Sequence, residues 1–239
     1  MDDNAVCYRR STDGGETWEP IFQFYQNDAN LKEIASQPTD RHMAVHGNYV
    51  HIAFGAYGDG STSWFGQFVY LRSTDGGQTF EQPRVLWTTR DISSPFWHAY
   101  NVYLSADADR TVLSFRQQRN WTDAYPFEFS AIVLTSEDNG ATFTETAAVS
   151  ADNQWELCDA FSSGDQIALQ YYQCSYSYGY IQFGNLFMAI SGDGGQTYHQ
   201  TQISVPSANG AHKTLGAHYQ HYAPVIAGAN GRIYTMFLA

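Results

Sequence analysis

The chain has 239 residues, of which 43% are hydrophobic and 16% are aromatic, and its formal net charge is −12. A charge of this sign argues against nucleic acid or an anionic membrane surface as the main partner, because both attract basic patches. No apolar run is long enough to span a bilayer, and residues 1–20 lack the apolar core of a signal peptide. We therefore expect one globular domain without a membrane-inserted segment.

A glycine-rich stretch of eight residues near the N-terminus returns three times along the chain. We call the four copies box 1 (Ser11–Trp18, STDGGETW), box 2 (Ser73–Phe80, STDGGQTF), box 3 (Ser136–Phe143, SEDNGATF) and box 4 (Ser191–Tyr198, SGDGGQTY). They begin about sixty residues apart, which is the length of a propeller blade or of another β-repeat unit. The repeat therefore predicts a fold built from similar β-units.

The sequence around the boxes predicts four strands in each unit. In residues 40–88 an extended run, a Gly-Asn turn and an alternating run indicate a hairpin, strands A and B. Strand C then leads into the box and strand D leaves it. Residues 97–150 and 154–205 repeat this order. Helical periodicity is confined to Asp28–Ser36, where we expect a short helix.

The two ends of the chain contain complementary halves of one more unit. Residues 1–24 supply only strands C and D with box 1, whereas residues 218–239 supply only strands A and B. Pairing these halves would remove an open sheet edge. We therefore predict one all-β domain, a propeller of four four-stranded antiparallel blades (218–239 with 1–24, 40–88, 97–150, 154–205) closed by its two ends. The alternative is a fragment of a six- or seven-bladed propeller.

The residue types of the boxes predict a structural role. Gly14 and Gly15 permit positive φ in a tight turn, and the Asp13 carboxylate can bond the amides of the turn. We expect Ser11 and Thr17 to bond across the hairpin and the aromatic residue to pack under the turn. A calcium site would need several carboxylates, and each box has one invariantly placed aspartate. The residues with this structural assignment are Ser11, Asp13, Gly15, Trp18, Ser73, Asp75, Gly77, Phe80, Ser136, Asp138, Gly140, Phe143, Ser191, Asp193, Gly195 and Tyr198.

The pattern S-x-D-x-G-x-T followed by an aromatic residue resembles the Asp-box, or BNR repeat, of the sialidase-like β-propellers. The resemblance covers essentially the whole chain. In that family the boxes lie on the face opposite the active site, so the resemblance also implies a structural role for them. Because the family includes glycosidases, lectin-like modules and scaffolds, it implies a fold more directly than a function.

The loops at the end opposite the boxes contain many aromatic residues. They are the B–C loops 56–67, 116–129 and 171–184 and the D–A connections 88–100 and 209–222. Tyrosine and tryptophan offer a flat apolar face with a polar group, which suits sugar rings and protein hot spots alike; the alternative is that they pack the undersides of their own loops. The candidate ligand-binding residues are Trp64, Trp97, Trp121, Tyr125, Tyr176, Tyr178, Arg116 and Arg119.

The starts of the A strands supply the candidate metal and catalytic residues. His42, His98 and His221 would surround the channel axis; they either chelate a metal or line a wet channel, and we expect no metal and no cofactor. The family enzymes hold the substrate carboxylate with three arginines, attack with a tyrosine assisted by a glutamate, and use an aspartate as acid. The matching positions are Arg41 as an arginine, Tyr219 or Tyr222 as nucleophile, Glu156 as its helper, and Asp159 or Asp91 as acid.

Two departures argue against the catalytic interpretation. The Arg-Ile-Pro stretch that usually introduces the first arginine is absent, and four blades in place of six remove positions that ordinarily supply the site. We therefore expect an extracellular or cell-surface module that recognises a glycan or a protein. The alternatives are a glycoside hydrolase of exo-sialidase type, a polysaccharide lyase, and a scaffold subunit of a larger assembly, a homo-oligomer included. Cys158 and Cys174 are expected on neighbouring strands, either as a disulfide or as buried thiols.

Overall fold

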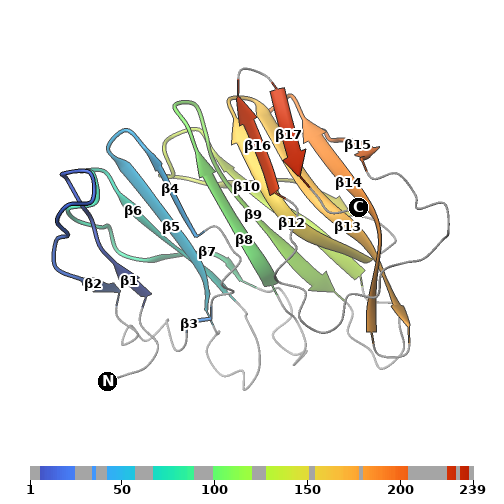
Figure 1. Cartoon of the computed structure of the whole chain (residues 1–239), viewed down its shortest axis with the longest axis horizontal. Coiled ribbons are helices and arrows are strands. Elements are labelled where there is room, and N and C mark those ends of the chain that lie inside the picture. Colours follow the sequence, from blue (N-terminus) through green and yellow to red (C-terminus); the bar gives the residue numbers. More distant parts are fainter. Residues whose placement is uncertain are drawn as a thin grey trace.

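The computed structural model describes residues 6–24, 34–35, 42–56, 67–88, 99–119, 128–150, 154–177, 180–203, 225–229 and 232–236. All regular elements within these ranges are strands (Figure 1). In chain order they are β1 (Val6–Tyr8), β2 (Phe22–Phe24), β3 (Ile34–Ala35), β4 (Met43–His46), β5 (Tyr49–Ala56), β6 (Gln67–Ser73), β7 (Arg84–Thr88), β8 (Ala99–Ala106), β9 (Thr111–Arg119), β10 (Glu128–Ser136), β11 (Thr144–Ser150), β12 (Gln154–Ser163), β13 (Gln166–Ser177), β14 (Tyr180–Ser191), β15 (His199–Gln202), β16 (Val225–Ala229) and β17 (Arg232–Met236).

The strands form five antiparallel sheets, which we number in chain order. Sheet I is β1–β2, sheet II contains β3 to β7, sheet III is β8–β9–β10–β11, sheet IV is β12–β13–β14–β15, and sheet V is β16–β17. Sheets II, III and IV have the predicted order A, B, C, D, with boxes 2, 3 and 4 between strands C and D. The all-β prediction and the four-stranded repeat are therefore confirmed.

Strand A of sheet II is divided between two short segments. β4 pairs with the first half of β5, and β3 pairs with its end through Ile34↔Ala56 and Ala35↔Gly55. The predicted helix over Asp28–Ser36 is therefore wrong at Ile34–Ala35, because pairing with the end of β5 outweighs the local helical preference. No helix in the described part of the chain is long and apolar enough to cross a membrane.

The sheets stand face to face in a row and bury the core between them. Phe68, Tyr70 and Trp87 of sheet II pack against Leu104 and Phe115 of sheet III in one continuous apolar cluster. A second cluster joins sheets III and IV. The A strands also contact one another in succession, β4 with β8, β8 with β12 and β12 with β16. These contacts place the A strands on a common inner side, as in a propeller.

The predicted closure of the ring is wrong. Sheets I and V lie at opposite ends of the row (Figure 1), and in the described residues β1 pairs with β2 alone and β16 with β17 alone. Large rings separate neighbouring sheets; Phe68 and Phe115, for example, are 4.3 Å apart between ring centroids. Sheets I and V therefore do not meet, and the arc stays open.

Cys158 and Cys174 lie on the neighbouring strands β12 and β13, as predicted, but far apart along them. Cys174 is opposite Gln154, whereas Cys158 lies in the irregularity between Leu157 and Asp159. An offset of four residues along a strand corresponds to about 13 Å. A disulfide requires Cα atoms less than about 7 Å apart, so this register excludes a bond between the two cysteines.

Candidate functional site

The four boxes share one internal hydrogen-bond network, shown here for box 2. The amide of Gly77 donates to Ser73 Oγ over 2.8 Å, and the serine hydroxyl donates to Asp75 Oδ1 over 2.8 Å. The amide and hydroxyl of Thr79 donate to the same carboxylate over 2.9 and 2.6 Å. The serine and threonine therefore bond to the aspartate of their own turn, and not across the hairpin as the sequence suggested.

The other boxes repeat these bonds. In boxes 1, 3 and 4 the amide of the second glycine position donates to the box serine over 2.8, 2.7 and 2.8 Å. The threonine amides donate to Asp13, Asp138 and Asp193 over 2.9, 2.8 and 2.9 Å. The threonine hydroxyls, followed by the backbone amides, hold the pKa of each aspartate well below its usual range. Each carboxylate is thus ionised and committed to its own turn.

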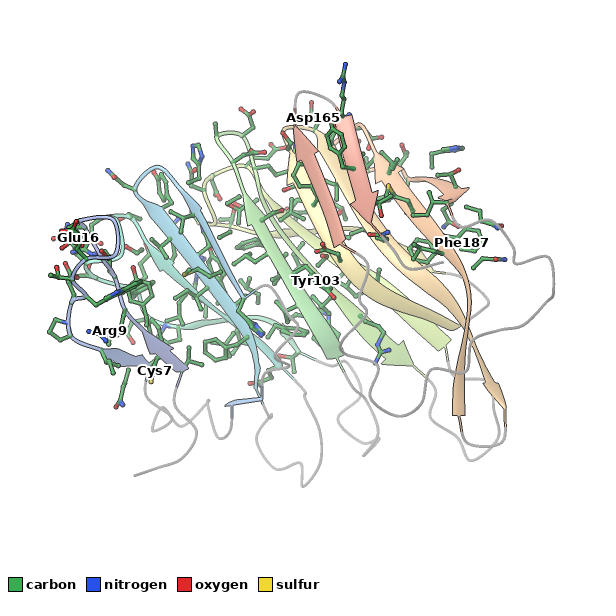
Figure 2. The ribbon with its side chains drawn as sticks, viewed as in Figure 1. Cys7, Arg9, Glu16, Tyr103, Asp165 and Phe187 are labelled. Carbon is green, nitrogen blue, oxygen red and sulfur yellow. The ribbon has the colours of Figure 1, made fainter. Side chains whose placement is uncertain are left out.

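Two boxes are anchored to the A–B turn of their own sheet. The amide of Gly76 donates to the carbonyl of Asn48 over 2.7 Å, and the amide of Gly194 donates to the carbonyl of Asp165 over 2.9 Å. The boxes and the A–B turns therefore lie at the same end of the strands, which we call the box end. Figure 2 shows Glu16 of box 1 and Asp165 at this end.

A tyrosine from the preceding sheet fills the space beside the glycine of the next box. A Cβ atom on Gly77 would overlap the hydroxyl of Tyr8, and one on Gly140 would overlap the hydroxyl of Tyr70. The box aromatics complete the contact, since Phe80 packs against Tyr8 at 5.1 Å and Phe143 against Tyr70 at 5.0 Å between centroids. Each of these boxes is thus a socket for a side chain from the sheet before it.

Trp18 of box 1 departs from this arrangement. Its side chain is 54% exposed, whereas the sequence predicted that it would pack under the turn. A Cβ atom on Gly15 of the same box would meet nothing within 4 Å. Among the described residues, box 1 therefore has the socket geometry without a tyrosine in it.

Arginines add a second link between sheets. Arg10 Nη1 donates to the carbonyl of Gly76 over 2.9 Å, and Arg72 Nη1 donates to the carbonyl of Asn139 over 3.3 Å. Each also forms a bidentate ion pair within its own hairpin, Arg10 with Glu19 and Arg72 with Glu81.

In sheet III a threonine, Thr135, precedes the box, and the arginine link comes from another position. Arg110, in the β8–β9 turn, bonds Gly194 O at 3.3 Å and Asp165 at 2.9 Å. The sequence analysis missed these links between sheets. The pattern Tyr-x-Arg directly before boxes 1 and 2 was the available signal.

A buried histidine and tyrosine stand between sheets II and III at the box end. His51 Nδ1 and Tyr70 Oη are 2.6 Å apart, and both side chains are at most 1% exposed. Burial, followed by the charge of Arg72, lowers the pKa of His51 to about 4, and burial raises the pKa of Tyr70. Both groups are therefore neutral at pH 7.

The structure describes the side chains of three candidate residues on or next to strands A and B. Asp159 is 4% exposed in β12, and its Oδ1 accepts the amide of Ala160 over 2.8 Å. His42 Nδ1 donates to the carbonyl of Ala53 over 2.9 Å, which ties its ring to strand B of its own sheet. Arg116 is half-buried on β9. In the described part of the chain, no cluster of three or more His, Cys, Asp or Glu residues has the geometry of a metal site.

Only the backbone places three further candidates. Glu156 is opposite Tyr172, Arg119 is opposite Glu128, and Tyr176 is opposite Ile181. Arg119 and Tyr176 thus lie near the ends of their strands that point away from the boxes. The remaining candidates lie outside the described residues: Arg41, Trp64, Asp91, Trp97, His98, Trp121, Tyr125, Tyr178, Tyr219, His221 and Tyr222.

Comparisons with known proteins agree with the repeat and the sheet arrangement. The family model described as BNR/Asp-box repeat matches residues 9–20. A complex of the GH93 α-L-arabinofuranosidase of Fusarium graminearum with arabinobiose aligns with 99% of this chain and 68% of its own, at 16% identity and a TM-score of 0.56. Trypanosoma rangeli sialidase in complex with sialic acid aligns with 98% of this chain and 36% of its own, at 10% identity and a TM-score of 0.53.

No curated protein sequence matches the chain. Of the two solved structures, the chain spans about two thirds of the arabinofuranosidase and about one third of the sialidase. Identities this low establish a shared fold and no shared activity. Together with the four boxes, they show that this chain carries Asp-box repeats on the fold of the sialidase-like β-propellers.

Proposed function

We propose that the chain is a recognition module that binds a glycan at the strand ends opposite the boxes. The commitment of the box carboxylates to their own turns carries this proposal. An aspartate that accepts hydrogen bonds from its own serine and threonine, as Asp75 does, offers little to a ligand. Recognition is therefore assigned to the B–C loops and D–A connections.

The composition of those segments supports a carbohydrate ligand. The aromatic rings of Trp64, Trp97, Trp121, Tyr125, Tyr176 and Tyr178 would stack on sugar rings, and Arg116 and Arg119 would bond hydroxyl or carboxylate groups. Two proteins that share the fold contain arabinobiose and sialic acid. The same surface would suit a protein ligand in an extracellular assembly.

A second candidate function is glycoside hydrolysis. It is favoured by the two structural neighbours, both of which are glycosidases, and by the buried Asp159 on an inner strand. In this proposal Glu156 accepts the proton of Tyr219 or Tyr222 as that tyrosine attacks the anomeric carbon, and Asp159 or Asp91 protonates the leaving group. Water then displaces the tyrosine from the anomeric carbon. Arg41 would bind a carboxylate on the substrate.

A glycan array combined with fluorogenic sialoside and arabinofuranoside assays tests both candidates. We expect a glycan ligand without turnover, and we expect Trp121→Ala to weaken its binding at least about tenfold with an unchanged melting temperature. Trp18→Ala is the matched control, because it removes an exposed tryptophan at the box end. Turnover would favour the enzyme, and a folded sample that binds no glycan would overturn the recognition proposal.

A further inference from the structure

In the described part of the chain, an apolar face of sheet II is exposed next to sheet I. Met43 and Val45 of β4 are 50% and 55% exposed. They pair with Ile52 and Val50, which pack against Val6, Tyr8 and Phe24 of sheet I in one apolar cluster. Met43 and Val45 therefore lie on the face directed toward sheet I, beside an interface that is already formed.

In sheet III, the strand A residues that correspond to Met43 and Val45 are covered by sheet II. Val102 and Leu104 of β8, which belong to the strand A of sheet III, are 2% and 0% exposed and pack against Phe68 and Tyr70 of sheet II. Sheet I differs from sheet II because it contains only strands C and D in the described residues. The exposed face on β4 is thus the place where strands A and B of the first blade would lie.

Sheet V contains strands A and B alone in the described residues. Ile233 of β17 packs on sheet IV, and Tyr234, which points to the opposite face, is 54% exposed. In this position Tyr234 is directed away from the preceding sheet, as His51 is in sheet II. Sheet V therefore presents an apolar ring where a following blade would dock.

The two half-sheets cannot pair within this arc, because they lie at its opposite ends (Figure 1). We propose that two copies of the chain associate head to tail, with sheet V of one copy and sheet I of the other forming a composite four-stranded blade. β17 then pairs with β1 as strand B pairs with strand C, and sheet V covers Met43 and Val45 of the second copy. The contact is heterologous, so each copy contributes two different surfaces.

The repeated register fixes which residues would meet. Where two residues separate strands A and B, the second residue of strand B is opposite the box serine, as in Val50↔Ser73 and Ile167↔Ser191. Two residues also separate β16 and β17. Ile233 is therefore opposite Ser11 of the other copy, and Tyr234 lies near Tyr8 as His51 lies near Tyr70.

Sedimentation velocity over a range of protein concentrations tests the association. We expect the wild type to associate and Val45→Glu and Tyr234→Glu each to raise the dissociation constant at least about tenfold, because each places a charge in the apolar contact. Val85→Glu is the matched control, since Val85 is a 42% exposed strand valine on β7, outside the proposed contact. Far-UV circular dichroism and melting temperature verify folding, and Met43→Gln replaces Val45→Glu if that variant is unfolded.

Mixing the two charge variants distinguishes head-to-tail association from other contacts. Val45→Glu leaves the sheet V surface intact, and Tyr234→Glu leaves the sheet II surface intact. An equimolar mixture should therefore form a dimer through the one remaining pair of intact surfaces, although neither variant associates alone. A wild type that stays monomeric at about 100 μM, or a mixture that forms no dimer, would overturn the proposal.

Discussion

At the scale of single residues, the aspartate of each box illustrates how an exposed charge is used for structure. Asp75 Oδ1 accepts the Ser73 hydroxyl and the amides of Gln78 and Thr79, while Oδ2 accepts the Thr79 hydroxyl. Such bonds favour the ionised carboxylate, which explains its lowered pKa. They also fix the backbone of the turn, in which Gly76 and Gly77 both have positive φ.

We expect Asp75→Ala to lower the melting temperature by about 2–4 °C, because amides and hydroxyls of the turn lose their common acceptor. Asp109→Ala is the control, since Asp109 is an exposed turn aspartate outside any box. Thermal unfolding followed by circular dichroism measures both. Equal melting temperatures for the two variants would show that the carboxylate does not stabilise the turn.

Alanine substitutions at the second glycine of two boxes distinguish the stability lost through backbone strain from the stability lost through a clash between sheets. Gly77 and Gly15 have φ of 82° and 95°, but only Gly77 faces a tyrosine hydroxyl from the preceding sheet. We expect Gly15→Ala to cost about 1 kcal/mol through backbone strain alone. Gly77→Ala should cost about 2–4 kcal/mol, because overlap with Tyr8 is added.

Urea denaturation of both glycine variants measures this difference. Adding Tyr8→Phe to Gly77→Ala removes the overlapping oxygen, so part of the lost stability should return. The same tyrosine change combined with Gly15→Ala should give no recovery. A Gly77→Ala variant no less stable than Gly15→Ala would contradict the socket.

At the scale of elements, the sheets are joined by polar groups as well as by apolar packing. His51 on β5 and Tyr70 on β6 share a buried hydrogen bond beside Gly140 of the next sheet. Arg84 lies over the Tyr70 ring at 5.1 Å and bonds the carbonyls of Gly140 and Ala141. One interface between sheets thus contains a histidine that must stay neutral.

This histidine predicts a pH dependence of stability. The pKa of His51 is lowered from 6.5 to about 4, so between these values the unfolded chain binds more protons than the folded one. Stability therefore falls as pH is lowered through this window, by about 2 kcal/mol from pH 7 to pH 5. The box aspartates, whose folded pKa is also lowered, add a further loss only below about pH 4.

Urea denaturation at pH 7 and pH 5 measures the histidine effect. His51→Gln should be less stable than the wild type at pH 7, because the buried bond to Tyr70 is altered. It should nevertheless lose much less stability on acidification. A variant with the same pH dependence as the wild type would assign the effect to other groups.

The elements were predictable where the signal is local. The alternating run after the Gly-Asn turn and the glycines of box 2 identify a strand and a turn, because side-chain period and positive φ depend on neighbouring residues. The pairing of β3 with β5 was not predictable, since Ile34–Ala35 lies in a segment with helical periodicity. The contact of Tyr8 with Gly77 also joins positions far apart in the sequence, and a single sequence does not reveal such contacts.

At the scale of the whole molecule, the prediction of a closed ring failed for a physical reason. The complementary half-blades do not by themselves indicate where the partner strands of each half lie. The arrangement of successive sheets depends on how side chains such as Phe68 and Phe115 pack between them, and these contacts join positions far apart in the sequence. The candidate site depends still more on long loops, whose conformation follows no periodic pattern, so its residues remain predictions from composition.

The sockets have a direction along the chain. Tyr8 precedes Gly77, Tyr70 precedes Gly140, and Arg110 precedes the Gly194 carbonyl that it bonds. A box closes on its own residues, so its hairpin can form within microseconds of leaving the ribosome. Because proteins are made from the N-terminus, the hairpins of boxes 2, 3 and 4 each meet a tyrosine or arginine that was synthesised before them. The chain can thus assemble its blades one after another at the pace of translation, without waiting for a residue still to be made.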